Sequence, residues 1–200
     1  MEGGRLPPRF ASAEVAPSRV TIMVIFTIGH STHPLPEFIG LLKLHGVSLV
    51  VDVRTVPRSR HNPQYNRETL PGSLALENIA YEHMAGLGGL RKADSPSPNT
   101  AWRNASFRGF ADYMQTEAFR DSIDRLAASA ELSRPALMCA EALPWRCHRW
   151  LIADALKARG IEVDHIMAGG NLKGHVMTGF AKIVDRGRVI YPAEPGAFCA

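Results

Sequence analysis

The chain has 200 residues, of which 46% are hydrophobic, and its 23 Lys and Arg against 19 Asp and Glu give a net charge of +4. A chain of this length buries roughly 70% of its unfolded surface in one core, which leaves little room for two full domains. The mild positive charge permits an anionic ligand without requiring nucleic acid.

The cysteines and the lengths of the apolar runs indicate where the protein works. Three cysteines are an odd number, which argues against a disulfide framework. No secretory hydrophobic segment is present, and no apolar run approaches the ~20 residues of a membrane span. We therefore expect a cytoplasmic protein with free or ligand-bound thiols and no membrane partner.

Glycine and proline divide the chain into three parts. Residues 1–22 contain Gly and Pro pairs without periodic hydrophobicity and are predicted to form a disordered arm, so Met23 is an alternative start. Residues 23–170 are predicted to form a single α/β domain. Residues 171–200 are expected to be a C-terminal extension, with a hairpin or a small capping element around 184–189.

Hydrophobic patterning places strands and helices in alternation along the domain. A continuous apolar run predicts a buried strand at 24–28, and further strands are predicted at 47–53, 79–83, 135–139 and 161–167. Helical spacing predicts helices at 34–45, 67–78, 107–114, 117–130 and 145–159, the last ended by Gly160. The stretch 86–104 is rich in Gly, Ser and Pro and is expected to be a long functional connection such as a lid.

This alternation predicts an α/β fold with a mostly parallel sheet and helices on both faces. A Rossmann-like or rhodanese-like three-layer sandwich fits this order of elements. In such sheets the ligand lies beyond the carboxyl ends of the strands. Three segments with reactive side chains follow strands there, at residues 29–31, 52–54 and 139–141, and we expect them to converge.

Thiols and imidazoles near these strand ends are the candidate catalytic groups. The helix predicted at 145–159 places Cys147, His148 and Arg149 in its first turn, where a thiol pKa is lowered by the helix dipole. The catalytic candidates are Cys139, Cys147, His148 and His30. The alternatives are that Cys139 is core filler and that His30 caps the following helix.

Arginines and small polar residues supply the candidate ligand-binding groups. The loop after the second strand contains Arg54, Arg58, Arg60 and Arg67 and no acidic residue before Glu68, which suits a phosphate or carboxylate ligand. The binding candidates are Ser31, Asp52, Arg54, Arg58, Ser59, Glu141, Arg146 and Arg149. The alternatives are a solvated basic loop and an Asp52 that only caps the next turn.

Three functions remain open at this point. The first is a thiol-dependent transferase or hydrolase that acts on a small anionic or phosphate-containing ligand. The second is metal binding by Cys139, Cys147, His148 and His30, although no Cys-x-x-Cys pair is present, so no residue is assigned as a metal ligand and the cofactor stays unknown. The third is an accessory contact with nucleic acid through the arginine loop, with Tyr65 as a stacking platform.

Several short motifs together resemble a known family. They are Thr27-Ile28-Gly29-His30-Ser31, Asp52-Val53-Arg54 with Pro57 and Ser59, Leu87-Gly88-Gly89, Trp102 with Phe107-Arg108-Gly109-Phe110-Ala111-Asp112-Tyr113-Met114, and Cys139-Ala140-Glu141 with Cys147-His148-Arg149. In this order they are similar to the bacterial domain-of-unknown-function family 488 (DUF488) from about Val24 to Met167. The resemblance names the motif residues but implies no reaction.

A more distant similarity is to rhodanese-like sulfurtransferases. It implies that Cys139 ends a strand as the reactive thiol and that Arg146 belongs to the anion loop. The loop 139–146 departs from that pattern, because it contains Glu141 and Pro144 and no glycine. Such a loop is a poor cradle for sulfate or phosphate.

Overall fold

The computed structural model describes residues 23–194, and the arm predicted over residues 1–22 lies outside this range. A six-stranded sheet in the order β3-β2-β4-β1-β5-β6 forms its centre. Pairing is parallel from β3 to β5, and only the edge strand β6 is antiparallel. The strands are β1 (Val24–Gly29), β2 (Leu49–Asp52), β3 (Ala80–His83), β4 (Pro135–Cys139), β5 (Glu162–Ile166) and β6 (Leu172–Gly174).

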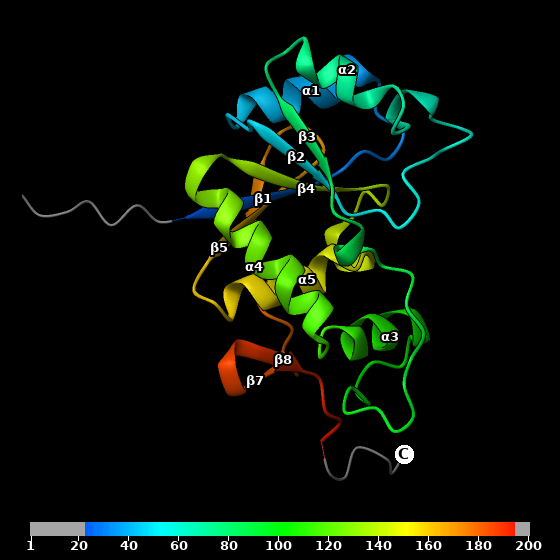
Figure 1. Cartoon of the computed structure of the whole chain (residues 1–200), viewed down its shortest axis with the longest axis vertical. Coiled ribbons are helices and arrows are strands. Elements are labelled where there is room, and N and C mark those ends of the chain that lie inside the picture. Colours follow the sequence, from blue (N-terminus) through cyan, green and yellow to red (C-terminus); the bar gives the residue numbers. More distant parts are fainter. Residues whose placement is uncertain (1–22, 195–200) are drawn as a thin grey trace, which may run out of the picture.

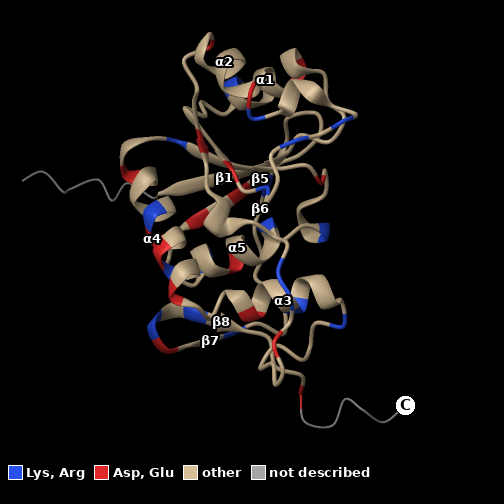
Figure 2. Ribbon diagram, turned by 45° about the vertical axis from the view of Figure 1, so that its right-hand side comes forward, with Lys and Arg blue, Asp and Glu red and all other residues tan. Residues whose placement is uncertain are grey.

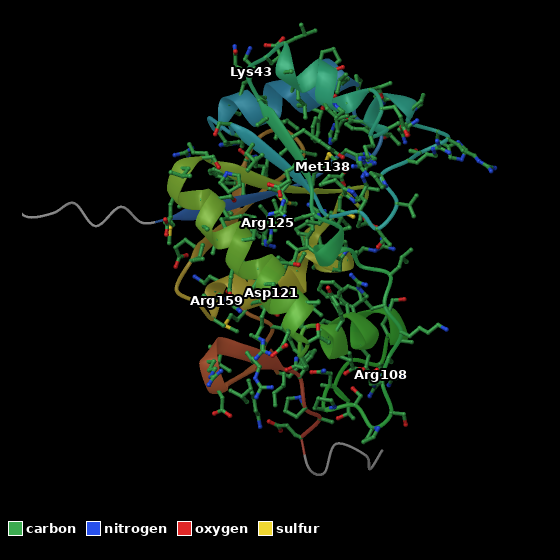
Figure 3. All side chains as sticks on the ribbon, viewed as in Figure 1. Lys43, Arg108, Asp121, Arg125, Met138 and Arg159 are labelled. Atoms are coloured by element: carbon green, nitrogen blue, oxygen red, sulfur yellow. The ribbon has the colours of Figure 1, made fainter. Side chains whose placement is uncertain are left out.

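Helices cover both faces of this sheet, so the predicted α/β three-layer architecture is confirmed (Figure 1). One face packs on α1 (Leu35–Leu44) and α2 (Leu70–Ala75), and the other on α3 (Ala105–Tyr113), α4 (Glu117–Leu132) and α5 (Arg149–Lys157). Met138 of β4 lies between the layer that carries Lys43 and the layer that carries Asp121 (Figure 3).

Alternate residues of the central strands supply the two cores. Phe26 and Ile28 of β1 pack with α1, whereas Ile25 packs with α5. This division follows from the period-two alternation of side chains along a strand. Among residues 23–194, no helix is long and apolar enough to cross a membrane.

Two helices differ from their predicted spans because of proline. The helix expected at 67–78 is a 3₁₀ turn at Pro63–Tyr65 followed by the short α2. Pro71 lacks an N–H and constrains the residue before it, so it is accommodated in the first turn of α2 rather than inside a longer helix.

The predicted helix 145–159 is also interrupted, and this corrects the position of the candidate thiol. Pro144–Arg146 forms a 3₁₀ turn, Cys147 is extended with φ −127° and ψ 148°, and α5 begins only at Arg149. The N–H of Cys147 closes this turn by donating to the carbonyl of Pro144. Cys147 therefore precedes the helix, His148 is its N-cap residue and Arg149 is its first helical residue.

The long connection 86–104 is held in place by one buried carboxylate. Asp112 of α3 accepts hydrogen bonds from the Asp94 N–H, the Ser97 hydroxyl and the Asn99 amide. These bonds anchor the loop on the side of the sheet where its residues Gly89 and Leu90 reach the cavity described below. Its movement as a lid stays a prediction.

The C-terminal segment packs on the same domain. The expected hairpin is present as β7 (Lys182–Val184) and β8 (Arg188–Ile190), which pair antiparallel. Tyr191, directly after β8, is fully buried and donates its hydroxyl to Asp154 of α5. This bond connects the end of the described chain to the helix that follows the candidate site.

Candidate active site

The carboxyl ends of β1, β2 and β4 open into one cavity of about 640 Å³. Backbone hydrogen bonds continue the pairing of β1 and β4 past the sheet, from His30 N–H to Cys139 O at 2.9 Å and from Ser31 N–H to Ala140 O at 3.0 Å. The predicted site residues that line the cavity are His30, Arg54, Arg58, Ser59, Cys139, Glu141, Arg146, Cys147 and His148. Ser31, Asp52 and Arg149 do not belong to its lining.

Cys147 is held between two nitrogen groups of the residues that follow it. The Arg149 Nε donates to the Cys147 Sγ at 3.4 Å, and the His148 Nδ1 lies 3.6 Å from the same sulfur. The His148 Nε2–H donates to the carbonyl of Val53 at 3.0 Å. In the neutral ring this bond leaves the Nδ1 lone pair directed at the thiol, so His148 is placed to accept its proton.

A second thiol lies beside the first. The Sγ atoms of Cys139 and Cys147 and a ring nitrogen of His148 all lie within 4.8 Å of one another. The pKa of Cys147 is well below that of an ordinary thiol, because Cys139 donates a hydrogen bond to its thiolate and because Arg149 and His148 stabilise the charge, while burial acts in the opposite direction. The pKa of Cys139 is raised by its hydrogen bond to Cys147 and by burial.

The positive charge of Arg54 is compensated within the protein by Asp52. Its guanidinium donates to both carboxylate oxygens of Asp52, the shortest contact being 2.6 Å, and also to the Tyr65 carbonyl at 2.7 Å. Asp52 is fully buried and accepts a further bond from the Tyr81 hydroxyl at 2.8 Å. Arg54 therefore lines the cavity as one half of a buried ion pair and not as a free positive charge.

His30 contacts the same ion pair. Its Nδ1–H donates to the Ser31 carbonyl at 2.9 Å, which leaves Nε2 to accept from the Arg54 guanidinium at 3.2 Å. Burial and the charge of Arg54 lower the pKa of His30 to about 4. Its ring stacks on Tyr65, with centroids 4.1 Å apart. Both ring nitrogens are occupied, so this neutral imidazole shapes the cavity.

The free positive charge of the cavity lies at its rim. Arg58 and Arg146 are exposed residues of the lining, and Arg58 forms a long, solvent-exposed ion pair with Glu68 at 3.7 Å. Basic stretches of the loop after β2 are visible in blue on the right of Figure 2. Glu141 directs a carboxylate oxygen to the Leu143 N–H at 3.2 Å. Val56, Leu90 and Phe107 add apolar surface between these groups.

Cys139, Cys147 and His148 are also the donor set within residues 23–194 that is chemically suited to Zn²⁺. Charge balance disfavours a dication there. Arg149 is only 1% exposed, and one thiolate on Cys147 already neutralises it. Zn²⁺ with two thiolates would itself be neutral and would leave this buried guanidinium without a counter-charge. The arrangement is better suited to an activated thiol.

Two features of the site depend on backbone atoms that sequence patterns do not reveal. A Cβ built on Gly89 would lie 2.5 Å from the His148 Nδ1, so only glycine leaves room for the ring. A Cβ on Gly29 would collide with the carbonyl oxygen of Glu141. In the sequence, the contact between Gly89 and His148 is indicated only by the glycine pair of the motif Leu87-Gly88-Gly89.

Comparison with known proteins gives one match. Residues 34–156 match the family model described as Domain of unknown function DUF488, which confirms the resemblance seen in the motifs. No curated protein and no solved structure matches the chain significantly. The matched residues include Asp52, Arg54, both cavity thiols and His148, whereas His30 precedes them. Because the match covers more than half of the sequence, the chain belongs to the DUF488 family.

Proposed function

We propose that this protein is a thiol-dependent enzyme that transfers a group from a small anionic ligand to Cys147. The observation that carries the proposal is the contact of one cavity-lining sulfur with both a buried guanidinium, at 3.4 Å, and an imidazole nitrogen, at 3.6 Å. This is the arrangement of an activated nucleophile, in which a base and a fixed positive charge favour the thiolate.

The residues of the site divide the work of the reaction. Cys147 attacks the electrophilic atom of the ligand, and any proton on its sulfur passes to the His148 Nδ1. The Val53 carbonyl accepts the opposite N–H of that ring, which orients the ring toward the sulfur. The same nitrogen then returns the proton to the leaving group. Asp52, Arg54 and His30 keep the opposite wall rigid.

The ligand is anionic because the charged side chains of the lining that are not held in a buried pair, Arg58 and Arg146 against Glu141, are positive in sum. Arg54 is paired with Asp52, and Arg149 with the Cys147 thiolate, so Arg58 and Arg146 are left to receive a carboxylate or phosphate. The apolar surface of Val56, Leu90 and Phe107 is suited to an uncharged part of the same molecule.

Two alkylating reagents of nearly the same size test both parts of this proposal. Iodoacetamide is neutral and measures the reactivity of Cys147 alone, whereas iodoacetate also measures the attraction of an anion. In a Cys199→Ser background, we expect Cys147 to react faster than a free thiol at pH 6–7 with both reagents, as followed by mass spectrometry of the labelled peptide. A rate no higher than that of free cysteine would contradict the proposal.

Arginine variants separate the ligand from the nucleophile. Arg58→Gln and Arg146→Gln should slow iodoacetate several-fold and leave the rate with iodoacetamide unchanged. Arg60→Gln is the matched control, because Arg60 belongs to the same loop but does not line the cavity. Equal effects of all three substitutions would indicate a general charge effect and would count against an anion site.

The prediction that Tyr65 is a stacking platform for nucleic acid is wrong. Tyr65 is fully buried, and its hydroxyl donates to the His33 carbonyl at 2.9 Å. The Tyr65 ring stacks against His30 instead of facing solvent. The arginine loop therefore lacks the aromatic surface on which single-stranded bases stack.

A further inference from the structure

The cavity contains a second sulfur that a single-nucleophile mechanism does not use. Cys139 ends β4, lines the same cavity as Cys147, and its Sγ lies within 4.8 Å of the Cys147 Sγ. The two residues come from different elements, one from the sheet and one from the turn before α5. Their closeness is thus a product of the fold and not of a local sequence repeat.

We propose that Cys139 and Cys147 act together as a dithiol that reduces small disulfides carrying carboxylate groups, with Cys147 attacking and Cys139 resolving. This inference rests on the proposed function, because it identifies the group transferred to Cys147 as a thiol. The carboxylates of the substrate would be held by Arg58 and Arg146 at the rim, while its sulfur–sulfur bond reaches the two thiols at the base of the cavity.

The first step transfers half of the substrate to the enzyme. The Cys147 thiolate attacks one sulfur of the small disulfide, the substrate S–S bond breaks, and a Cys147–substrate disulfide forms. The second half leaves as a thiolate and takes up a proton. One sulfur–sulfur bond is exchanged for another, so no external oxidant is needed.

The second step is favoured by the change in charge that the first step causes. The leading reason for the raised pKa of Cys139 is its hydrogen bond to the Cys147 sulfur, and this hydrogen bond is lost once Cys147 is in a disulfide with the substrate. The charge of Arg149 and the backbone hydrogen bond from Glu141 lower the pKa of Cys139, and both remain. The pKa of Cys139 is therefore lower after Cys147 has reacted than before, although burial still raises it.

Resolution then completes the exchange. The Cys139 proton passes to the His148 Nδ1, the Cys139 thiolate attacks the Cys147 Sγ, and the bond from Cys147 to the substrate breaks. The released thiolate takes the proton from His148. In sum, two protein thiols are oxidised to one disulfide and one small disulfide is reduced to two thiols. A further turnover uses an external thiol reductant.

A single-turnover experiment on the full chain tests this sequence. The reduced Cys199→Ser protein is mixed with oxidised glutathione, released thiol is measured, and the protein is weighed by intact mass spectrometry under acid quench. We expect two thiols released per chain and a product with an internal Cys139–Cys147 disulfide. Cystamine, a disulfide that carries amines instead of carboxylates, should react about tenfold more slowly, the value of roughly one charge-assisted hydrogen bond.

Cysteine variants identify the role of each sulfur. Cys139→Ser should release one thiol and stop as a stable mixed disulfide on Cys147, and Cys139→Ala repeats the test without a hydroxyl. Circular dichroism verifies that both remain folded. The inference is overturned if the parent also stops at the mixed disulfide, or if both variants release the second thiol as fast as the parent.

Failure of this inference is distinguishable from failure of the proposed function. If Cys147 reacts rapidly with iodoacetamide but its mixed disulfide is never resolved, the nucleophile stands and the dithiol mechanism is wrong. If Cys147 is unreactive with iodoacetamide and with disulfides alike, the proposed function and the inference built on it both fail.

Discussion

The negative charge of Cys147 depends on neighbours of different kinds. Cys139 donates a neutral S–H, Arg149 supplies a fixed charge, and His148 supplies a ring nitrogen. Arg149 is itself fixed by a hydrogen bond to the Glu141 carbonyl, so its guanidinium cannot turn away. A buried thiolate beside a buried guanidinium is a neutral pair, which explains how both groups are accommodated away from water.

Replacing Arg149 tests this pair at the scale of one residue. Arg149→Met keeps an unbranched side chain but removes the charge, so the pKa of Cys147 should rise. The pH at which iodoacetamide labelling is half-maximal should move upward, with a several-fold loss of rate at pH 6 and little loss at pH 9. Arg134→Met, at the far end of β4, is the control. An unchanged pH midpoint in Arg149→Met would show that the guanidinium does not stabilise the thiolate.

The strands and their ends were predictable at the scale of elements because local sequence determines them. Strands β2 and β4 are apolar runs, and the polar residues Asp52 and Cys139 stand where these runs end. The start of α5 was not predicted correctly. Helical periodicity places it at residue 145, but Pro144–Arg146 forms a 3₁₀ turn and α5 begins at Arg149. The Asp52–Arg54 pair and the approach of Gly89 to His148 depend on contacts that no periodicity encodes.

Glycine variants test how tightly the long connection is fitted to the site. Gly89→Ala would force its methyl group into the His148 ring, displacing the Nδ1 from Cys147 and lowering the rate of alkylation at pH 7 several-fold. Gly40→Ala in α1 is the matched control, since its Cβ meets nothing within 4 Å and alanine stabilises a helix by roughly 0.5–1 kcal/mol. A Gly89→Ala protein with full reactivity would show that the position of this ring is unimportant.

A second buried polar network joins the elements behind the site. Thr27 of β1 donates to the His165 Nδ1 at 2.7 Å, His165 to His175 at 3.1 Å, and His175 to the Asp154 carboxylate at 2.8 Å. Tyr191 donates to the same carboxylate at 2.9 Å. Each bond runs in one direction along the chain of groups, which leaves no donor or acceptor in conflict.

Asp154→Ala should therefore destabilise the fold strongly. It leaves the His175 ring, the Tyr191 hydroxyl and the Thr178 hydroxyl without their shared acceptor. We expect a loss of roughly 3–5 kcal/mol in the free energy of unfolding, measured by urea denaturation. Asp124→Ala, a substitution of an exposed carboxylate on α4, should cost less than about 1 kcal/mol. Similar losses in both variants would contradict a structural role for the network.

At the scale of the whole molecule, the ion pairs leave an uneven charge distribution. The buried positive groups Arg54 and Arg149 are matched within the fold, by Asp52 and by the Cys147 thiolate. The excess positive charge is therefore concentrated on exposed side chains, including those at the rim of the cavity (Figure 2). A negatively charged ligand would be attracted to this positive rim.

The same preference for neutral buried groups should make the fold sensitive to acid. Burial lowers the pKa of His165 to about 3, helped by His175, and burial with Arg54 lowers that of His30 to about 4. In the unfolded chain a histidine titrates near pKa ~6.5. Between pH 6.5 and pH 5 the unfolded chain therefore binds protons at both positions and the folded chain does not, so stability falls as the pH falls. Each histidine contributes a slope of up to about 1.4 kcal/mol per pH unit.

Urea denaturation between pH 5 and pH 6.5 measures this slope in a Cys147→Ser background. The substitution removes the thiol, because its lowered pKa would also make the stability fall as the pH falls. His165→Gln should keep an acceptor for Thr27 and a donor for His175 but remove one titrating group, which makes the pH dependence shallower. His61→Gln, at an exposed position of the arginine loop, should leave the slope as it is in the parent. The account would be wrong if His165→Gln and the parent lost stability equally steeply, because the proton uptake on unfolding would then come from other groups.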